Sequence, residues 1–329
     1  MTQQTLVSPG IDRSVTLDCV GDWGQANFHR ILSWLSQEFC DRAGSRSRVR
    51  ISSVLGAGLE ALWEVSDGEM DLCIVTPHAL MDKALTGEDF FAGRAPMPQL
   101  RALAVLPQVD RLVFAVAPKF KVSSFEDLRT QKPALRIASS RTDDGNFIGY
   151  TADIFMEAHG ISEQVLNSWG GEYVRAHRPD QCLQLVRDGL ADAVVQEAIM
   201  TPWWRDLIED GSLRPVSAEM QALDALGKKL HLAAATIPAG YWKGQDQPIH
   251  ALDFSDFVLV ARADMPDDVA YLLAWCLVET RDKIERQYKH ILPEQSPLSY
   301  PLNPIAMAKS VLPLHPGARR YYQEAGHLK

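Results

Sequence analysis

Two short segments of the sequence share one pattern, and this pattern constrains the fold more than any other feature. The segments are VSDGEMDLCIV at residues 65–75 and VRDGLADAVV at residues 186–195. The matching residues stand 121 positions apart in each pair: Asp67 and Asp188, Gly68 and Gly189, Asp71 and Asp192. In both places the pattern predicts a helix that ends at a glycine, which can adopt the left-handed conformation, and a short strand that follows.

Strand-like segments extend the repeat on its amino-terminal side. SVTLDCV at 14–20 corresponds to LRIASS at 135–140, and each is followed by a turn and a helix. RVRISSV at 48–54 and GEYVRA at 171–176 occupy the second-strand position of each half. The chain is therefore predicted to contain two β-α-β-α-β units, each with a parallel sheet and right-handed crossovers.

The connections between these units predict a two-lobed α/β protein with parallel-dominated sheets. After the first unit come two strands, LRALAVL and RLVFAVAP, and a helix with Ser124 as N-cap and Asp127 at the reciprocal capping position. The Gly- and Pro-rich loop IPAGYWKGQDQPIHALD precedes a strand, FSDFVLVARA, and one long helix or two, which we expect to pack back on the first lobe. Two crossovers between similar lobes predict a hinge and a ligand cleft. The expected divisions are a tail at 1–13, lobe 1 at 14–117, lobe 2 at 118–253 and a return of lobe 1 at 254–329.

Composition excludes several classes of partner. The 329 residues carry 33 Lys and Arg against 42 Asp and Glu, a formal net charge of -9, so we expect no nucleic-acid partner. We also expect no membrane insertion, because Asp110 and Arg111 interrupt the most apolar stretch.

The first residues lack the features of a secretory signal. We therefore expect a cytoplasmic protein as written, or a periplasmic one if an export signal was trimmed or missed. The five cysteines, without CxxC spacing, predict reduced core thiols.

The motifs of common cofactor and metal sites are missing from the sequence. The first turn has Gly21 and Gly24 but no third glycine of a G-x-G-x-x-G motif, and the second strand ends in Ser52 and Ser53, not in an acid. The sequence contains no P-loop, no H-E-x-x-H and no G-x-S-x-G elbow. We therefore expect no cofactor and no metal.

Small polar residues follow the predicted parallel strands, at the end of the sheet where open α/β proteins bind ligands. Helix N-termini at that end offer free N–H groups and a positive dipole end, which suits a small anion. The candidate ligand-binding residues are Gly21, Asp22, Trp23, Gly24, Ser52, Ser53, Thr76, His78, Ser139, Ser140, Arg141, Thr142, Asn146, Gln196 and Glu197.

Arg141 is the most informative of these candidates, because its guanidinium can bind a carboxylate with two hydrogen bonds. A salt bridge to Asp143 or Asp144 is the competing interpretation. Trp23 either stacks on a ligand or packs, and His78 is more often a packing or capping residue than a ligand contact.

Several motifs together resemble the TAXI-type solute receptors of TRAP transporters, which have the type II periplasmic-binding-protein fold. The strongest is LHPGARRYYQEAG at 314–326, supported by TIPAGYWKGQDQ, SDGEMDLCIV, LRALAVL and DDVAYLLAWCLVE. The first of these predicts a short helix with Pro316 in its first turn and Gly326 at its end, docked through Tyr321 and Tyr322. The resemblance implies capture of a small organic acid, carboxylate or amino-acid-like, by lobe closure. It also implies TRAP membrane subunits as partners, or descent to a soluble sensor.

The first loop departs from the family pattern. GDWGQANF places Asp22 and Trp23 where relatives carry small residues, so ligand identity does not carry over. The alternative is an enzyme on the same fold, for example a decarboxylase acting on an aromatic or dicarboxylic acid. Its candidate acid, base and carboxylate-binding groups are Asp22, His78, Arg141, Asp144 and Glu197.

Overall fold

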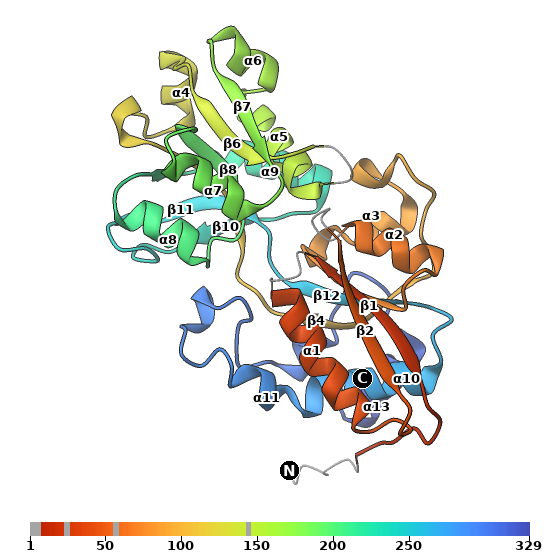
Figure 1. Cartoon of the computed structure of the whole chain (residues 1–329). Helices are drawn as coiled ribbons and strands as arrows, with labels where there is room; N and C mark the ends of the chain where they lie inside the picture. Colours follow the sequence, from red (N-terminus) through yellow and green to blue (C-terminus); the bar gives the residue numbers. More distant parts are fainter. Residues whose placement is uncertain (1–7, 23–26, 55–58, 143–145) are drawn as a thin grey trace. The chain divides into compact units, whose positions relative to one another are not determined.

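The chain forms two compact units in the computed structural model, which describes residues 8–22, 27–54, 59–142 and 146–329 (Figure 1). Unit 1 comprises Met1–Gln108 and Asp256–Lys329, and unit 2 comprises Val109–Ser255. The sequence placed the first division after residue 117, whereas the structure places it after Gln108. The physical reason is that strand β5 (Arg111–Val116) pairs with β8 and β9 of unit 2.

Unit 1 contains a five-stranded sheet in the order β2-β1-β3-β12-β4. Strand β1 (Thr16–Asp22) runs parallel to β2 (Arg48–Val54) and β3 (Leu72–Val75), as the first repeat predicted. Strand β12 (Phe257–Arg262) is antiparallel to β3 and to β4 (Leu100–Leu106). The segment after residue 254 thus returns to the first unit, as expected.

Unit 2 contains a seven-stranded sheet in the order β10-β11-β5-β8-β6-β7, with β9 paired to β5. Strand β6 is parallel to β7 and β8, as the second repeat predicted. The other pairings are antiparallel, because β5 and β10 run against the strands of the repeat, whereas β11 and β9 run with them. The expectation of parallel-dominated sheets is therefore wrong, and both sheets are mixed. The strands are β6 (Arg136–Ser140), β7 (Glu172–Ala176), β8 (Ala193–Gln196), β9 (Arg214–Val216), β10 (Ala234–Ile237) and β11 (Ile249–Asp253).

Helices connect and cover these strands. Helix α1 (Asn27–Cys40) buries the apolar stripe of Phe28, Ile31, Leu32, Leu35 and Phe39. The predicted capping box at the start of α4 is present, with Asp127 N–H donating to Ser124 Oγ at 3.0 Å. The remaining α-helices are α2 (Leu59–Asp67), α3 (Asp82–Thr86), α4 (Phe125–Gln131), α5 (Phe147–Ala158), α6 (Glu163–Ser168), α7 (Pro179–Arg187), α8 (Pro202–Glu209), α9 (Met220–Leu230), α10 (Asp267–Glu279), α11 (Arg281–Glu285), α12 (Pro304–Met307) and α13 (Pro316–Glu324).

The repeated Asp-Gly segments have the same local structure in both units. Gly68 and Gly189 follow α2 and α7 with φ of 80° and 69°, the left-handed region that glycine adopts without strain. Two residues after the short turn, Asp71 Oδ2 accepts a hydrogen bond from the backbone N–H of Asp18 in β1, at 2.8 Å. Asp192 Oδ2 accepts one from the backbone N–H of Arg136 in β6, at 3.3 Å.

The C-terminal motif forms a helix that docks within unit 1. Pro316 begins α13, and Gly326 after it has φ of 73°. Tyr321 donates to Glu279 at 2.7 Å, and Tyr322, completely buried, donates to the backbone oxygen of Leu103 at 3.2 Å. These contacts fix α13 against α10 and β4 of unit 1; the sequence predicted docking through the two tyrosines but not these partners.

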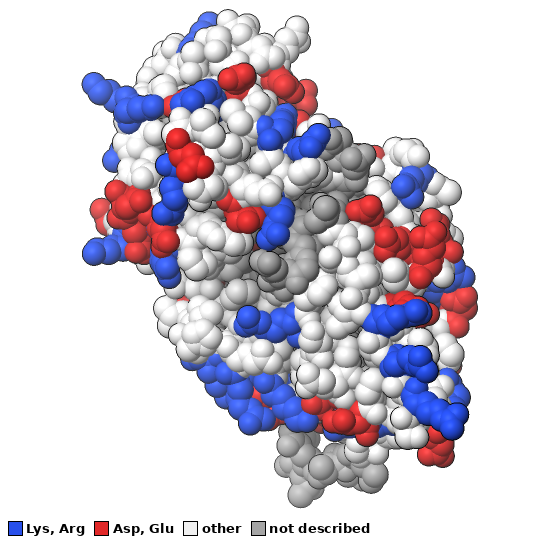
Figure 2. All heavy atoms as spheres, in the orientation of Figure 1, with Lys and Arg blue, Asp and Glu red and all other residues white. Residues whose placement is uncertain are grey.

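The surface carries both signs of charge on each unit, with basic and acidic side chains intermixed on the face shown in Figure 2. Among the described residues, no helix combines the length and the apolar character that crossing a bilayer requires.

Candidate functional site

In unit 1 the predicted residues gather at the carboxyl edge of the parallel strands. Gly21 and Asp22 end β1, and Ser53 pairs with Gly21 across the β1–β2 ladder. Ser52 faces the other way along β2, and its hydroxyl donates to the backbone oxygen of Cys19 at 3.3 Å. The remaining two candidates of this turn, Trp23 and Gly24, lie outside the described residues.

Thr76 and His78, which follow β3, make their contacts within unit 1. Thr76 Oγ1 donates to the backbone oxygen of Asp256 at 3.0 Å. His78 Nε2 accepts the backbone N–H of Val311 at 2.9 Å and lies 3.1 Å from Ser310 Oγ. Burial lowers the pKa of His78 to about 4, although Asp82 opposes the shift. The neutral imidazole therefore holds the C-terminal segment in place, which favours the packing interpretation.

In unit 2, Ser139, Ser140 and Gln196 lie at the carboxyl ends of adjacent strands β6 and β8 and are completely buried. Gln196 Nε2 donates to Ser140 Oγ at 2.8 Å and lies 3.3 Å from Cys182 Sγ. These two residues therefore tie the strand ends together. Ser139 Oγ, in contrast, has no hydrogen-bond partner among the described residues.

The turn after β6 is held tightly against the start of α5. Asn146 caps the helix by accepting the Gly149 N–H at 3.1 Å, and its Nδ2 donates to the His177 backbone oxygen at 3.2 Å. A Cβ at Gly149 would lie 2.0 Å from the backbone oxygen of Arg141, so only glycine permits this approach. Thr142 is exposed in the same turn.

Arg141 is exposed beside His177, the residue that follows β7. Arg141 Nη1 lies 3.0 Å from His177 Nε2, and its backbone N–H donates to Ala176 at 2.9 Å. Because a guanidinium has no acceptor, it donates in this contact, and His177 carries its proton on Nδ1. The salt-bridge partners that the sequence offered, Asp143 and Asp144, lie outside the described residues. Two groups that bind anions thus meet at the carboxyl edge of β6 and β7.

Glu197 follows β8 and is nearly buried beside Asp110, with which it hydrogen-bonds. Asp110 Oδ1 accepts the backbone N–H groups of Arg111, Ala198 and Ile199 at 2.7, 2.9 and 3.2 Å. Burial raises the pKa of Asp110, and the hydrogen bonds from Glu197 and from these backbone groups partly oppose that effect.

The sequence prediction missed His177 and Asp110. His177 directly follows β7, the second strand of its repeat, whereas the candidates on the second strand of the first repeat were Ser52 and Ser53. Asp110 was noticed as a charge that interrupts an apolar stretch, and a charge in such a stretch signals a buried, partnered carboxylate.

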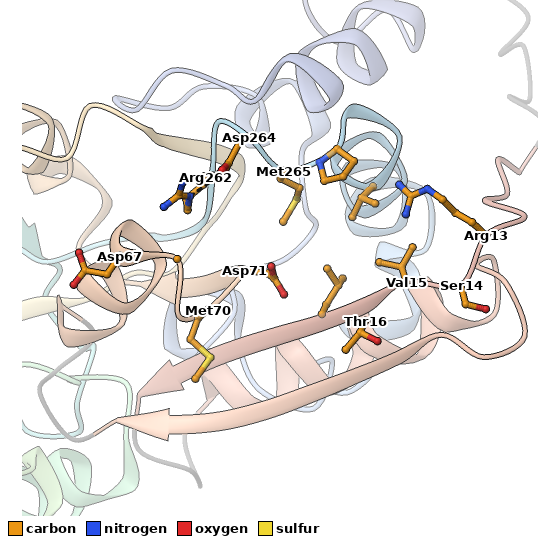
Figure 3. Close-up of a pocket in the computed structure, with 14 residues that line it drawn as sticks. Arg13, Ser14, Val15, Thr16, Asp67, Met70, Asp71, Arg262, Asp264 and Met265 are labelled. Carbon is orange, nitrogen blue, oxygen red and sulfur yellow. Dashed lines mark hydrogen bonds and ion pairs between the residues drawn. The ribbon is translucent and has the colours of Figure 1, made fainter.

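A cavity of about 600 Å³ lies in unit 1 at the opposite edge of the sheet (Figure 3). It is lined by the start of β1, by the residues after α2 and by the turn after β12. Both of its arginines are paired, because Arg262 binds Asp264 at 2.8 Å and Arg13 binds Asp268, which does not line the cavity, at 2.7 Å. The cavity lies away from the predicted residues that the structure describes, which are at the carboxyl edges.

Several solved structures have a fold similar to that of this chain. One, described as a periplasmic transporter, has a TM-score of 0.51 at 15% identity and covers 94% of this chain and 92% of its own. PhnD1 from Prochlorococcus marinus with methylphosphonate has a TM-score of 0.54 at 13% identity, and the match covers 95% of this chain and 99% of PhnD1. MatC from Rhodopseudomonas palustris with malate has a TM-score of 0.52 at 12% identity, and the match covers 95% of this chain and 97% of MatC. The chain thus has the two-lobed α/β fold of periplasmic binding proteins.

A family model matches residues 37–326, which is most of the chain. The chain belongs to the NMT1-like family.

Proposed function

We propose that this protein is a non-catalytic solute-binding protein that captures a small organic acid, carboxylate or amino-acid-like, and closes its two lobes on it. The observation that carries the proposal is the Arg141–His177 contact of 3.0 Å at the carboxyl edge of β6 and β7. A carboxylate arriving there gains a bidentate guanidinium partner beside an imidazole that has an N–H donor of its own.

Two further features support an anionic ligand. The start of α5, a helix of 12 residues, lies against the same turn and directs its first N–H groups toward that edge. The fold neighbours include one protein with bound malate and one with bound methylphosphonate, both of them small anions.

The biological setting that we propose is a TAXI-type receptor of a TRAP transporter, or a soluble sensor derived from one. The motifs of α13 and α10, which dock on one another in unit 1, support this assignment. A pull-down from membranes that contain candidate TRAP subunits, with and without ligand, tests it.

Binding is tested on protein that has been unfolded, dialysed and refolded to remove retained ligand. A panel of monocarboxylates, dicarboxylates and amino acids is screened by thermal unfolding, followed by mass spectrometry of the recovered compound. We expect one acid to raise the unfolding temperature and to be recovered unchanged, since a ligand stabilises only the state that binds it. Chemical conversion of that acid would support an enzyme instead.

The Arg141→Ala substitution tests the site itself. We expect it to weaken binding of the anionic ligand by about 1.5–3 kcal/mol, the usual contribution of a hydrogen bond to a charged group. Arg141→Lys should recover only part of this loss, because an ammonium cannot make the bidentate contact. Isothermal titration calorimetry measures both effects.

Arg205→Ala is the matched control, because Arg205 is an exposed arginine of the same unit whose partner is the adjacent Asp206. It should leave affinity unchanged. An Arg141→Ala variant that binds as well as the wild type would assign Arg141 to surface pairing.

A further inference from the structure

Two buried carboxyl groups meet at the carboxyl edge of unit 2. Asp110, completely buried, precedes β5, and Glu197, 5% exposed, follows β8. Strands β5 and β8 pair antiparallel, with Val113 opposite Gln196, and this pairing brings the two residues together. Their side chains hydrogen-bond one another. A hydrogen bond between two carboxyl groups requires a proton on one of them.

The backbone shows which of the two carries the negative charge. Asp110 accepts N–H groups from Arg111, Ala198 and Ile199. Ala198 has φ of 65°, an uncommon conformation for a residue with a side chain. Successive N–H groups that converge on one oxygen form a site for an anion. Three such donors favour the ionised form of Asp110, so Glu197 is the proton donor of the pair.

Two more side chains, Arg111 and Trp204, reach the pair from neighbouring elements. From β5, Arg111 is the cation that acts on Asp110, but its Nη1 also binds Asp253 of β11 at 2.8 Å. From the start of α8, Trp204 Nε1 donates to the backbone oxygen of Glu197 at 2.7 Å and adds no charge. The Arg111 charge is thus shared with a second carboxylate.

We propose that Asp110 and Glu197 share one proton near neutral pH, held on Glu197, so that the end of β8 presents a neutral acid where an anionic ligand binds. The part about the ligand rests on the proposed function. With both groups ionised, two negative charges would stand at an edge whose partner loop carries Arg141, and an anion would be repelled. Glu197 therefore acts as a specificity residue that admits anions.

The first test needs no ligand. Infrared difference spectroscopy follows the C=O stretch of protonated carboxyl groups in the wild type, Glu197→Gln and Glu38→Gln at neutral pH. Glu38 is the matched control, because it is 4% exposed like Glu197 but its carboxylate is paired with two cations, Arg42 and Lys283. We expect the wild-type signal to lose one carboxyl in Glu197→Gln and none in Glu38→Gln. Equal spectra for the wild type and Glu197→Gln would overturn the shared proton.

The second test measures affinity for L-malate and for inorganic phosphate as the pH rises from about 6 to 9. Glu197→Gln keeps a neutral hydrogen-bonding group at every pH. We expect wild-type affinity to fall about ten-fold more than that of Glu197→Gln as the pair loses its proton. His177 is present in both proteins, so the difference between the two profiles isolates Glu197.

The infrared and the affinity measurements distinguish failure of the shared-proton proposal from failure of the proposed function. Parallel pH profiles for the wild type and Glu197→Gln would contradict the role of Glu197 in admitting anions, even if both proteins bind. If neither probe nor any other small anion binds the wild type, the proposed function fails, while the infrared result still decides whether the pair shares a proton.

Discussion

Asp192 shows how one residue of the repeat stabilises a unit. Its carboxylate binds Arg136 Nε at 2.9 Å and Lys119 Nζ at 2.8 Å, and it also accepts the Arg136 backbone N–H. Burial raises the pKa of Asp192, but the hydrogen bonds from Arg136 and Lys119 outweigh burial and lower it to about 2. Since the folded pKa is depressed, the stabilisation is present above the unfolded pKa and is lost as the pH falls from about 4 to about 2.

Asp192→Asn should lower the free energy of unfolding by about 1–2 kcal/mol at neutral pH, less than the full shift implies because the cations are partly exposed. The difference from the wild type should vanish toward pH 2. Urea unfolding at several pH values measures it. Asp206→Asn, in an exposed pair with Arg205, is the control and should change little. A loss that is independent of pH would mean that packing, not charge, accounts for the effect.

At the scale of elements, the contact between α5 and the turn after β6 gives a second prediction. A methyl group at Gly149 would lie 2.0 Å from the backbone oxygen of Arg141 and 2.8 Å from that of Ser140. Gly149→Ala must therefore move the helix or the turn, and we expect it to destabilise the protein by about 1–3 kcal/mol. It should also weaken anion binding, because the Arg141 turn shifts.

Gly227→Ala in α9 is the matched control. The added Cβ would have its nearest contact at 3.4 Å, with the Leu232 backbone oxygen, so we expect a neutral change or a gain of up to about 1 kcal/mol from helix propensity. Thermal and chemical unfolding compare the two variants. Equal stabilities of the two variants would show that α5 can move away from the turn after β6 without a loss of stability.

The elements that the sequence predicted well are those with local signals. The capping box at Ser124 and the apolar stripe of α1 depend on residues within a few positions of one another, and both are present. The mixed sheets and the position of β5 depend on partners far along the chain, so the pattern of β5 alone could not assign its unit.

The candidate site likewise has a part that the sequence predicts and a part that depends on partners far along the chain. Strand order placed Ser140, Arg141 and Gln196 correctly at one edge, because parallel strands of a repeat end together. The contact of Arg141 comes from His177 and that of Glu197 comes from Asp110, and the positions of both partners depend on tertiary pairing. Whether these residues bind a ligand stays a prediction.

At the scale of the whole molecule, unit 2 is an insertion into unit 1. The two ends of unit 2 are adjacent, since Leu112 of β5 pairs with Leu252 of β11. At the junction in unit 1, the Asp256 backbone N–H donates a hydrogen bond to the Gln108 backbone oxygen at 3.2 Å. Unit 2 has its own core, in which Trp204 and Trp242 stack at 6.1 Å between ring centroids. We expect residues 109–255 to fold alone.

Circular dichroism and urea unfolding of that fragment check this prediction, and a cooperative transition is the expected result. Unit 1 with a short Gly-Ser bridge between Gln108 and Asp256 is the companion protein and should also fold. A fragment of residues 109–255 without a cooperative transition would mean that unit 2 depends on unit 1 for its stability.

The central claim is that the chain binds a small organic acid through Arg141 and leaves it unchanged. Calorimetric titration of ligand-stripped wild type and Arg141→Ala with the acid selected by thermal screening, followed by mass spectrometry of the recovered acid, tests it most directly. The account predicts saturable binding by the wild type, a loss of about 1.5–3 kcal/mol in the variant, and full recovery of the intact acid. Equal affinities in both proteins, or a converted acid, would contradict it.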